Sequence, residues 1–180
     1  MFSRLVVFSA AMFLKEKLSR CGFALVIFLC LPIGVFSQNK VPDRILIEKS
    51  ARTMKLMRGD EILKTYKVAL GTQPIGAKER QGDHKTPEGS YVVDAKNPNS
   101  QFYRALHISY PSGSDREHAR KLGVSAGGDV EIHGLGKGYG WIGAGHRMKD
   151  WTDGCIAVTN EEIDEIFPLV AIGTRVEIRP

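Results

Sequence analysis

The sequence predicts one compact, mostly β domain with two short helices. Short runs in which apolar and polar residues partly alternate recur through residues 44–179, and this alternation is typical of half-buried strands. Only two stretches combine a helical pattern with capping signals. Strand-like runs do not alternate regularly with helices, so a parallel βαβ architecture is not expected. The length of 180 residues fits one domain, with or without a targeting segment.

The expected strands are separated by turn residues. Gly59 and Asp60 turn the chain between the second and third runs, and residues 71–89 form a loop rich in glycine, lysine and proline. Within this loop, residues 86–89 (TPEG) suit a turn, because proline presets φ and glycine permits a positive φ. The expected strands are residues 44–48, 52–57, 62–69, 90–95, 105–110, 130–133 and 174–179.

The two expected helices each begin at a recognisable cap. The first covers residues 114–122, with Ser114 or Asp115 as its N-cap, and its alternating charges indicate a solvated face. The second begins at Thr159, where Glu162 completes a capping box in front of apolar residues that share one helix face. No repeat, low-complexity tract or internal linker interrupts the pattern, so residues 38–180 are expected to form a single domain.

Residues 1–37 differ from the rest in composition. Residues 21–36 are uncharged and follow a basic run, but 16 apolar residues are fewer than the ~20 that a membrane-spanning helix needs. The ending Val35-Phe36-Ser37 suits signal peptidase. We predict a cleaved signal peptide over residues 1–37, with export to the periplasm or cell envelope. The alternative is an uncleaved anchor, which would give transient membrane association, and Met12 is an alternative start.

The basic excess of the chain is concentrated in this leader. The whole chain carries a net charge of +5, and residues 38–180 carry +2. This small excess does not support a nucleic-acid partner. Cys155 is the only cysteine of residues 38–180. A lone thiol in an oxidising compartment cannot form an internal disulfide, so it is either a small buried apolar side chain or a reactive group.

Residues 131–158 hold the chemically informative side chains. Cys155 follows Gly154 at a loop-to-strand corner, where backbone amides of residues 153–155 could converge on an oxyanion. A cysteine nucleophile needs a base that takes its proton, usually an imidazole. His133, at the end of a strand, and His146, in the following loop, are the two candidates. The meeting of these groups in one segment favours catalysis at Cys155 and His133.

Other interpretations of this segment are weaker. Residues 138–143 match G-x-G-x-x-G, but neither a helical pattern nor a βαβ unit surrounds them, so a flexible active-site loop is favoured over a dinucleotide site. His133, His146, Asp153 and Cys155 lack the paired spacing of common zinc sites, so neither a metal nor another cofactor is expected. Asp153 could polarise a histidine or bind a substrate amine. Trp141 and Trp151 could each belong to the core or stack on a substrate.

Taken together, these motifs resemble the L,D-transpeptidase catalytic domain of the YkuD type. The similarity lies in His133-Gly134, in residues 150–158 (DWTDGCIAV), and upstream in residues 82–89 and 106–111. It extends over roughly residues 44–179. The resemblance implies a mainly β, sandwich-like catalytic domain with a cell-wall function.

The resemblance also implies a reaction and roles for particular residues. The substrate would be a peptidoglycan stem peptide, attacked by Cys155 with release of D-Ala, and the acyl group would pass to an amine. His133 would be the base, a carbonyl near Gly134 would orient it, and amides around Gly154 would hold the oxyanion. The candidates for substrate contact are Tyr110, His146, Trp151, Thr152 and Asp153.

Two departures from the family pattern bear on the base. Many members have Ser-His-Gly-Cys where this chain has Thr152-Asp153-Gly154-Cys155, so no second histidine adjoins the thiol, and His146 could fill part of that role. The interval of 22 residues from His133 to Cys155 is also a few residues longer than in many members. A third departure, His84 where a small residue is common, does not bear on the base. Two alternatives stay open on the sequence: a hydrolase of the same acyl-enzyme, either an L,D-carboxypeptidase or an amidase, and a non-catalytic peptidoglycan-binding protein.

Overall fold

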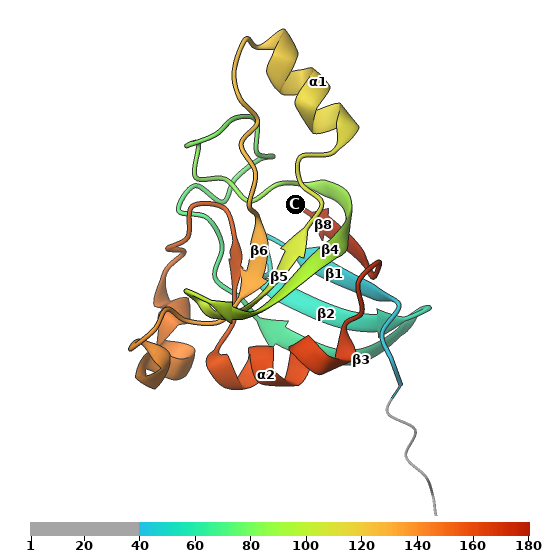
Figure 1. Cartoon of the computed structure of the whole chain (residues 1–180), viewed down its shortest axis with the longest axis vertical. Coiled ribbons are helices and arrows are strands. Elements are labelled where there is room, and N and C mark those ends of the chain that lie inside the picture. The colour runs from blue at the N-terminus through green and yellow to red at the C-terminus, as the bar shows by residue number, and fades with distance from the viewer. Residues whose placement is uncertain (1–39) are drawn as a thin grey trace, which may run out of the picture. The chain divides into compact units, whose positions relative to one another are not determined.

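The structure, a computed structural model, describes residues 40–180 (Figure 1). Eight strands form one mixed sheet in the order β3-β2-β1-β8-β4-β5-β6-β7. Two α-helices and one 3-10 helix accompany the sheet. The strands are β1 (Arg44–Glu48), β2 (Thr53–Arg58), β3 (Glu61–Lys67), β4 (Gly89–Ser100), β5 (Tyr103–Ile108), β6 (Glu131–His133), β7 (Ile156–Ala157) and β8 (Arg175–Arg179); the helices are α1 (Gly113–Lys121), η1 (Gly140–Met148) and α2 (Asn160–Leu169).

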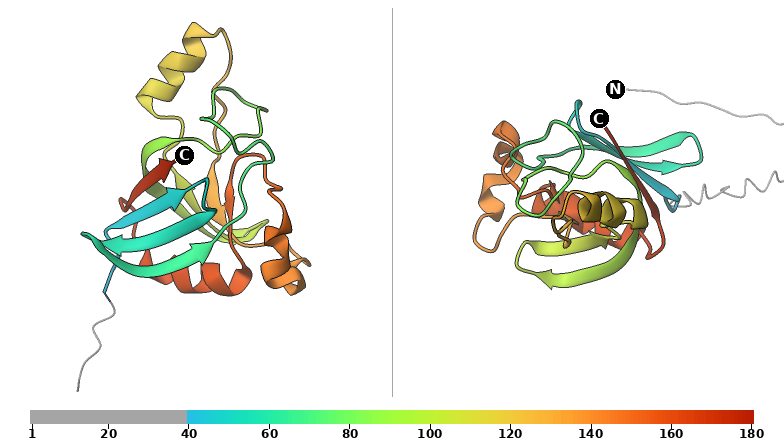
Figure 2. Two further views of the ribbon diagram at one scale, coloured as in Figure 1. Left: turned by 180° about the vertical axis from the view of Figure 1, so that it is seen from behind. Right: turned by 90° about the horizontal axis from the view of Figure 1, so that it is seen from above.

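Strand β4 divides the sheet into two halves. Its first residues pair with β8, and the residues from Val93 onward pair with β5, with register shifts inside this second pairing. One half is therefore β3-β2-β1-β8 and the other is β5-β6-β7, with the core between them (Figure 2). The chain after β3 then reaches β7, where the backbones of Ala69 and Ala157 exchange two hydrogen bonds of 3.0 and 2.9 Å. This link brings the ends of the two halves together and gives the sandwich-like form.

Most neighbouring strands are antiparallel, and two pairs are parallel. The meander β1-β2-β3 turns at Gly59, whose φ of 56° is accessible to glycine at little cost. Strand β8 joins this meander parallel to β1, with Ile45 opposite Val176. Strand β7 lies parallel to β6, with His133 opposite Ala157. The second parallel pair determines the site, because it places His133, at the end of β6, opposite Ala157, two residues after Cys155.

Helix α2 covers the core at one end of the domain. Thr159 caps it and forms the expected capping box with Glu162. Ile163 and Ile166 are fully buried in the core, and burial of each such side chain contributes roughly 1.5–3 kcal/mol. Helix α1 lies at the opposite end of the domain (Figure 1), and Ala119 is its one buried residue, which confirms the expected solvated face.

The predicted elements are largely confirmed, with three corrections. The N-cap of α1 was expected at Ser114 or Asp115, and this was wrong. Ser112 caps the helix and forms the capping box with Asp115. Strand β4 is longer than expected and continues to Ser100. Residues 140–148, expected as a flexible loop, form the 3-10 helix η1 with a kink at Gly143.

The predicted signal peptide lies outside the described residues. Within residues 40–180, no helix is both long enough and apolar enough to span a bilayer.

Candidate active site

Residues 150–155 form a tight loop that is fixed by its own side chains. Asp150 accepts from the Leu70 amide at 2.9 Å and from Arg52 at 2.9 Å. Thr152 Oγ1 donates to the Cys155 carbonyl at 2.8 Å and accepts from the Gly154 amide at 3.1 Å. Thr152 is 4% exposed, so its hydroxyl shapes the loop. The sequence interpretation of Thr152 as a substrate contact is not supported, since its hydroxyl is already bonded to the backbone.

Gly154 allows a second loop to approach the thiol. Its φ is 131°, a conformation that side chains disfavour, and a Cβ at this position would lie 2.7 Å from the Lys85 carbonyl oxygen. Gly71 makes a similar close approach, since a Cβ there would lie 2.2 Å from the His84 carbonyl oxygen. Residues 82–86 therefore pack directly against the backbone around Cys155.

Cys155 stands at the corner between this loop and β7. Its thiol is free, half-buried, and 3.6 Å from the Asp129 carbonyl oxygen, which accepts its hydrogen bond. The side chain lines a cleft of about 320 Å³ together with Lys78, His84, Asp129 and Asp153, among others. A thiol in such a corner is accessible from the cleft, while the strand that follows it is buried.

The surroundings of Cys155 keep the thiol protonated. Burial, and after it the carboxylates of Glu131, Asp153 and Asp129, raise the pKa of Cys155 to about 11, although a backbone hydrogen bond from Glu131 acts in the opposite direction. The free protein therefore holds a thiol, and not a thiolate, near neutral pH.

His133 ends strand β6 and is buried between aromatic rings. It is 1% exposed, its ring stacks on Phe102 with centroids 4.4 Å apart, and Trp151 meets it edge-on at 5.9 Å. Nδ1 lies 2.6 Å from the Gly134 carbonyl oxygen. A carbonyl only accepts hydrogen bonds, so Nδ1 carries the proton and Nε2 has the free lone pair. Burial lowers the pKa of His133 to about 4, an effect that the hydrogen bond to Gly134 partly offsets.

Strand register places His133 and Cys155 on one face. His133 is opposite Ala157 in the parallel pair, and Cys155 lies two residues before Ala157. Side chains two residues apart on a strand share a face, so the side chains of Cys155 and His133 point to the same side. Strand geometry separates the two positions by about 6.6 Å along the strand direction and about 4.8 Å between the strands. In the described part of the chain, no direct hydrogen bond joins the two side chains, and the thiol donates to the Asp129 carbonyl. Catalytic hydrogen bonds are often long without substrate.

His146 belongs to a different cleft. It is 8% exposed, its Nδ1 accepts from Trp151 Nε1 at 3.4 Å, and its buried Nε2 has no partner in residues 40–180. With Phe102, Tyr139 and Trp151 it lines a largely apolar cleft of about 680 Å³. Phe102 and Trp151 also contact His133, so this cleft adjoins the His133 imidazole. His146 does not meet the thiol.

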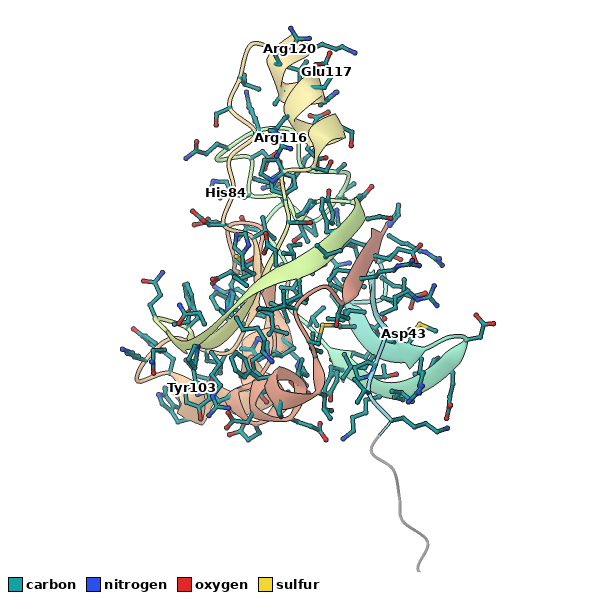
Figure 3. All side chains as sticks on the ribbon, turned by 45° about the vertical axis from the view of Figure 1, so that its right-hand side comes forward. Asp43, His84, Tyr103, Arg116, Glu117 and Arg120 are labelled. Carbon is teal, nitrogen blue, oxygen red and sulfur yellow. The ribbon has the colours of Figure 1, made fainter. Side chains whose placement is uncertain are left out.

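Sequence reasoning missed the partner of Asp153. His84 Nδ1 lies 2.8 Å from Asp153 Oδ1, and this pair joins residues 82–86 to the loop of residues 150–155 across the cleft. Figure 3 shows His84 on the side of the domain that carries α1. The two residues are 69 positions apart in the sequence, so no local pattern links them. The backbone of His84 is held in a positive φ of 56°.

A buried lysine was also missed. Lys78 is 8% exposed, lines the same cleft as Cys155, and donates to Asp83 Oδ1 at 2.7 Å. Burial of Asp83 acts against its ionisation, but Lys78 and three backbone amides together lower the pKa of Asp83 to about 2. This ion pair holds the turn that precedes His84, so it supports the wall of the cleft.

The other candidates for substrate contact are placed as follows. Tyr110 is 3% exposed and donates to the Ala126 carbonyl at 2.9 Å, so it belongs to the core and not to the cleft. This position does not support the interpretation of Tyr110 as a substrate contact. Trp151 lines the apolar cleft, whereas Trp141 is 84% exposed on η1. Among the described residues, His, Cys, Asp and Glu side chains form no group of three or more suited to a metal ion.

The pKa of the thiol yields a prediction about alkylation. With a pKa of about 11, only ~1 in 10⁴ molecules holds a thiolate at pH 7. The rate of alkylation by iodoacetamide should therefore rise about tenfold per pH unit from pH 7 to 10, measured by intact mass with circular dichroism as the control for unfolding. A rate that reaches its plateau near pH 7 would instead show a thiolate–imidazolium pair in the free protein.

Fold and site together define a mixed β domain with a buried histidine at the end of one strand and a free cysteine directly before the neighbouring parallel strand. The model of the YkuD family, described as the L,D-transpeptidase catalytic domain, matches residues 42–178. The chain therefore belongs to the L,D-transpeptidase catalytic domain family, a family of transpeptidase enzymes. This confirms the resemblance seen in the sequence motifs.

Two curated relatives carry the same family name. The Escherichia coli (strain K12) protein named "Putative L,D-transpeptidase YafK" is 35% identical over 136 residues, which are 72% of this chain and 47% of that protein. The Bacillus subtilis (strain 168) protein named "Putative L,D-transpeptidase YqjB" is 28% identical over 160 residues, which are 87% of this chain and 84% of that protein. The chain thus spans about half the length of the first relative.

Solved structures agree on the fold. The helical cell shape determining protein Pgp2 from Campylobacter jejuni is 25% identical with a TM-score of 0.58, covering 75% of this chain and 46% of that one. An L,D-transpeptidase from Mycobacterium smegmatis is 15% identical with a TM-score of 0.51, covering 76% and 58%. These likenesses confirm the mainly β, sandwich-like fold class.

Proposed function

We propose that this protein is an exported cysteine L,D-transpeptidase that acts on peptidoglycan stem peptides in the periplasm or cell envelope. The observation that carries the proposal is the pair formed by a free, cleft-lining Cys155 and by His133, whose imidazole is oriented by the Gly134 carbonyl on the adjacent parallel strand. Membership of the L,D-transpeptidase family supports the choice of substrate. The name of Pgp2 refers to cell shape, and a role in cell-wall shape is part of this proposal.

In the acylation step, the Cys155 sulfur attacks the carbonyl at the L-centre of the third-position diamino acid. Because the free pair is a neutral thiol and a neutral imidazole, the thiol proton passes to His133 Nε2 as the carbon–sulfur bond forms. The imidazolium then gives this proton to the departing amine of D-Ala. The bond to D-Ala breaks, and a thioester remains on Cys155.

The second step restores the thiol. An amine of a neighbouring stem peptide, or of an attached protein, attacks the thioester carbonyl and gives a proton to His133. The carbon–sulfur bond breaks, and the proton returns to the sulfur. The Gly154 amide is already bonded to Thr152, so the amides of Asp153 and Cys155 are the ones we assign to the oxyanion in both steps. This modifies the expectation that all three amides act together.

The second cleft provides a place from which the acceptor can arrive. It adjoins His133 through Phe102 and Trp151, and its walls are largely apolar. An apolar approach limits the access of water, which favours an amine over hydrolysis. The site is therefore better suited to transfer than to the alternative carboxypeptidase or amidase reaction.

Incubation with purified tetrapeptide muropeptides, followed by mass spectrometry, tests the proposal. We expect cross-linked dimers that have lost one D-Ala. Tripeptide products would assign the protein to the hydrolases of the same acyl-enzyme. Absence of any turnover by folded protein would contradict the enzymatic proposal and favour the peptidoglycan-binding alternative. The Cys155→Ala variant is the control for contaminating activity.

A further inference from the structure

The peptide unit between Gly134 and Leu135 is bonded by a side chain at each end. Its carbonyl oxygen accepts from His133 Nδ1 at 2.6 Å, and its N–H donates to Asn160 Oδ1 at 2.8 Å. A peptide unit is planar, so its C=O and N–H groups turn together. The side chain that holds the N–H therefore also sets the direction of the carbonyl that orients the imidazole.

Asn160 is held firmly enough to act in this way. It is the first residue of α2, directly after the N-cap Thr159. The capping-box residue Glu162 also forms an ion pair with Arg147 of η1, which ties the start of the helix to the neighbouring segment. The helix terminus is thus fixed from two sides, and the amide of Asn160 has a defined position.

Two glycines leave room for this amide. A Cβ at Gly134 would lie 2.7 Å from Asn160 Oδ1, and a Cβ at Gly140 would lie 2.7 Å from Asn160 Nδ2. Any side chain at either position would displace the Asn160 side chain. The amide therefore fills the space between the end of β6 and the start of η1, and it reaches the backbone beside His133 without contacting the imidazole.

We propose that Asn160 is a positioning residue for His133. By holding the Leu135 N–H, it aims the Gly134 carbonyl at Nδ1, which keeps the proton on Nδ1 and leaves Nε2 as the basic atom. This inference rests on the proposed function, in which His133 accepts the thiol proton. Asn160 acts only through the peptide unit, so its loss should impair proton transfer more than substrate binding.

The test combines histidine NMR with acylation kinetics in the full chain. In the wild type, ¹⁵N shifts of the His133 ring should show a proton on Nδ1. Asn160→Leu keeps the approximate shape but removes the acceptor. We expect a mixture of His133 tautomers and an acylation rate constant for a carbapenem that is 10- to 100-fold lower, part of the roughly 10²- to 10⁴-fold that a general base contributes. The concentration for half-maximal rate should change less than about threefold.

Two further variants separate positioning from general destabilisation. Asn160→Asp keeps an oxygen within reach of the Leu135 N–H, so it should retain the Nδ1 tautomer and an acylation rate within about fivefold of the wild type. Glu161→Gln, on the exposed neighbouring residue, is the matched control and should behave as the wild type. If Asn160→Leu does not fold, Asn160→Ser, too short to reach Leu135, carries the same expectation.

The inference is overturned if the tautomer and the rate are unchanged in Asn160→Leu or Asn160→Ser. It is also overturned if Asn160→Asp and Asn160→Leu lose the same fraction of the rate. Failure of the proposed function would look different. A wild-type protein that no carbapenem acylates would contradict that function, while the tautomer measurement would still report whether Asn160 orients His133.

Discussion

Replacement of Cys155 by alanine should abolish covalent labelling by a carbapenem. The acyl-enzyme requires a bond between the sulfur and the carbonyl carbon of the ligand, and no other described cysteine can provide it. We expect the acylation rate to fall by roughly 10³-fold or more, as in enzymes that lose their nucleophile. The side chain is half-buried and loses a single heavy atom, so the cost in stability should be about 1 kcal/mol or less. Intact-mass spectrometry and peptide mapping measure the adduct.

A serine variant sharpens this test. Cys155→Ser keeps nearly the same size and hydrogen-bonding capacity, so its loop geometry should match that of the wild type. A hydroxyl is a much weaker nucleophile at neutral pH, so this variant should also lack the adduct. An adduct at or near the wild-type level on the alanine protein would refute Cys155 as the nucleophile and direct attention to another residue.

Replacement of His133 by glutamine should slow acylation by roughly 10²- to 10⁴-fold, the contribution of a well-placed general base. The pH dependence follows from the pKa of His133, which burial lowers to about 4. The neutral imidazole is the active form and predominates above this value. The acylation rate of the wild type should therefore be maintained as the pH falls from 7 to 5 and should decline toward pH 4, whereas an ordinary histidine would lose activity near pH 6.5.

Two other histidines distinguish a specific loss from a general one. His118 lies on α1 and is half-exposed beside Glu79, so His118→Gln should retain the wild-type rate. His146 is the alternative base suggested by the sequence. If His146→Gln slowed acylation by roughly 10²- to 10⁴-fold and His133→Gln did not, His146 and not His133 would be the base.

Much of the fold was predictable, because local patterns specify most of its elements. Strand β1 and the capping box of α2 occur where alternation and capping residues predicted them. The helix η1 was not predicted, because glycines that suggest a loop also permit the kink at Gly143. The parallel pairing of β8 with β1 was not predictable either, since it joins strands at the two ends of the domain and no local signal encodes it.

The candidate site was predictable only where its residues lie close together in the sequence. Cys155 and His133 lie within one segment of 23 residues, so their association was visible along the chain. The pair of His84 and Asp153 joins positions 69 residues apart. Tyr110 packs in the core, and His146 lines the second cleft. Neither position could be predicted, because it depends on the direction in which the side chain packs.

The sequence alone determined the family, the mainly β class, and the cysteine and histidine on which the proposed chemistry depends. These conclusions follow from residue types and short spacings, which are properties of the chain itself. Only the tertiary structure decided the state of the two groups. The parallel pairing of β6 with β7 sets their shared face, and burial moves the pKa values of Cys155 and His133 apart, to about 11 and about 4. Burial is a property of the packed domain, because desolvation exists only when distant segments enclose the group.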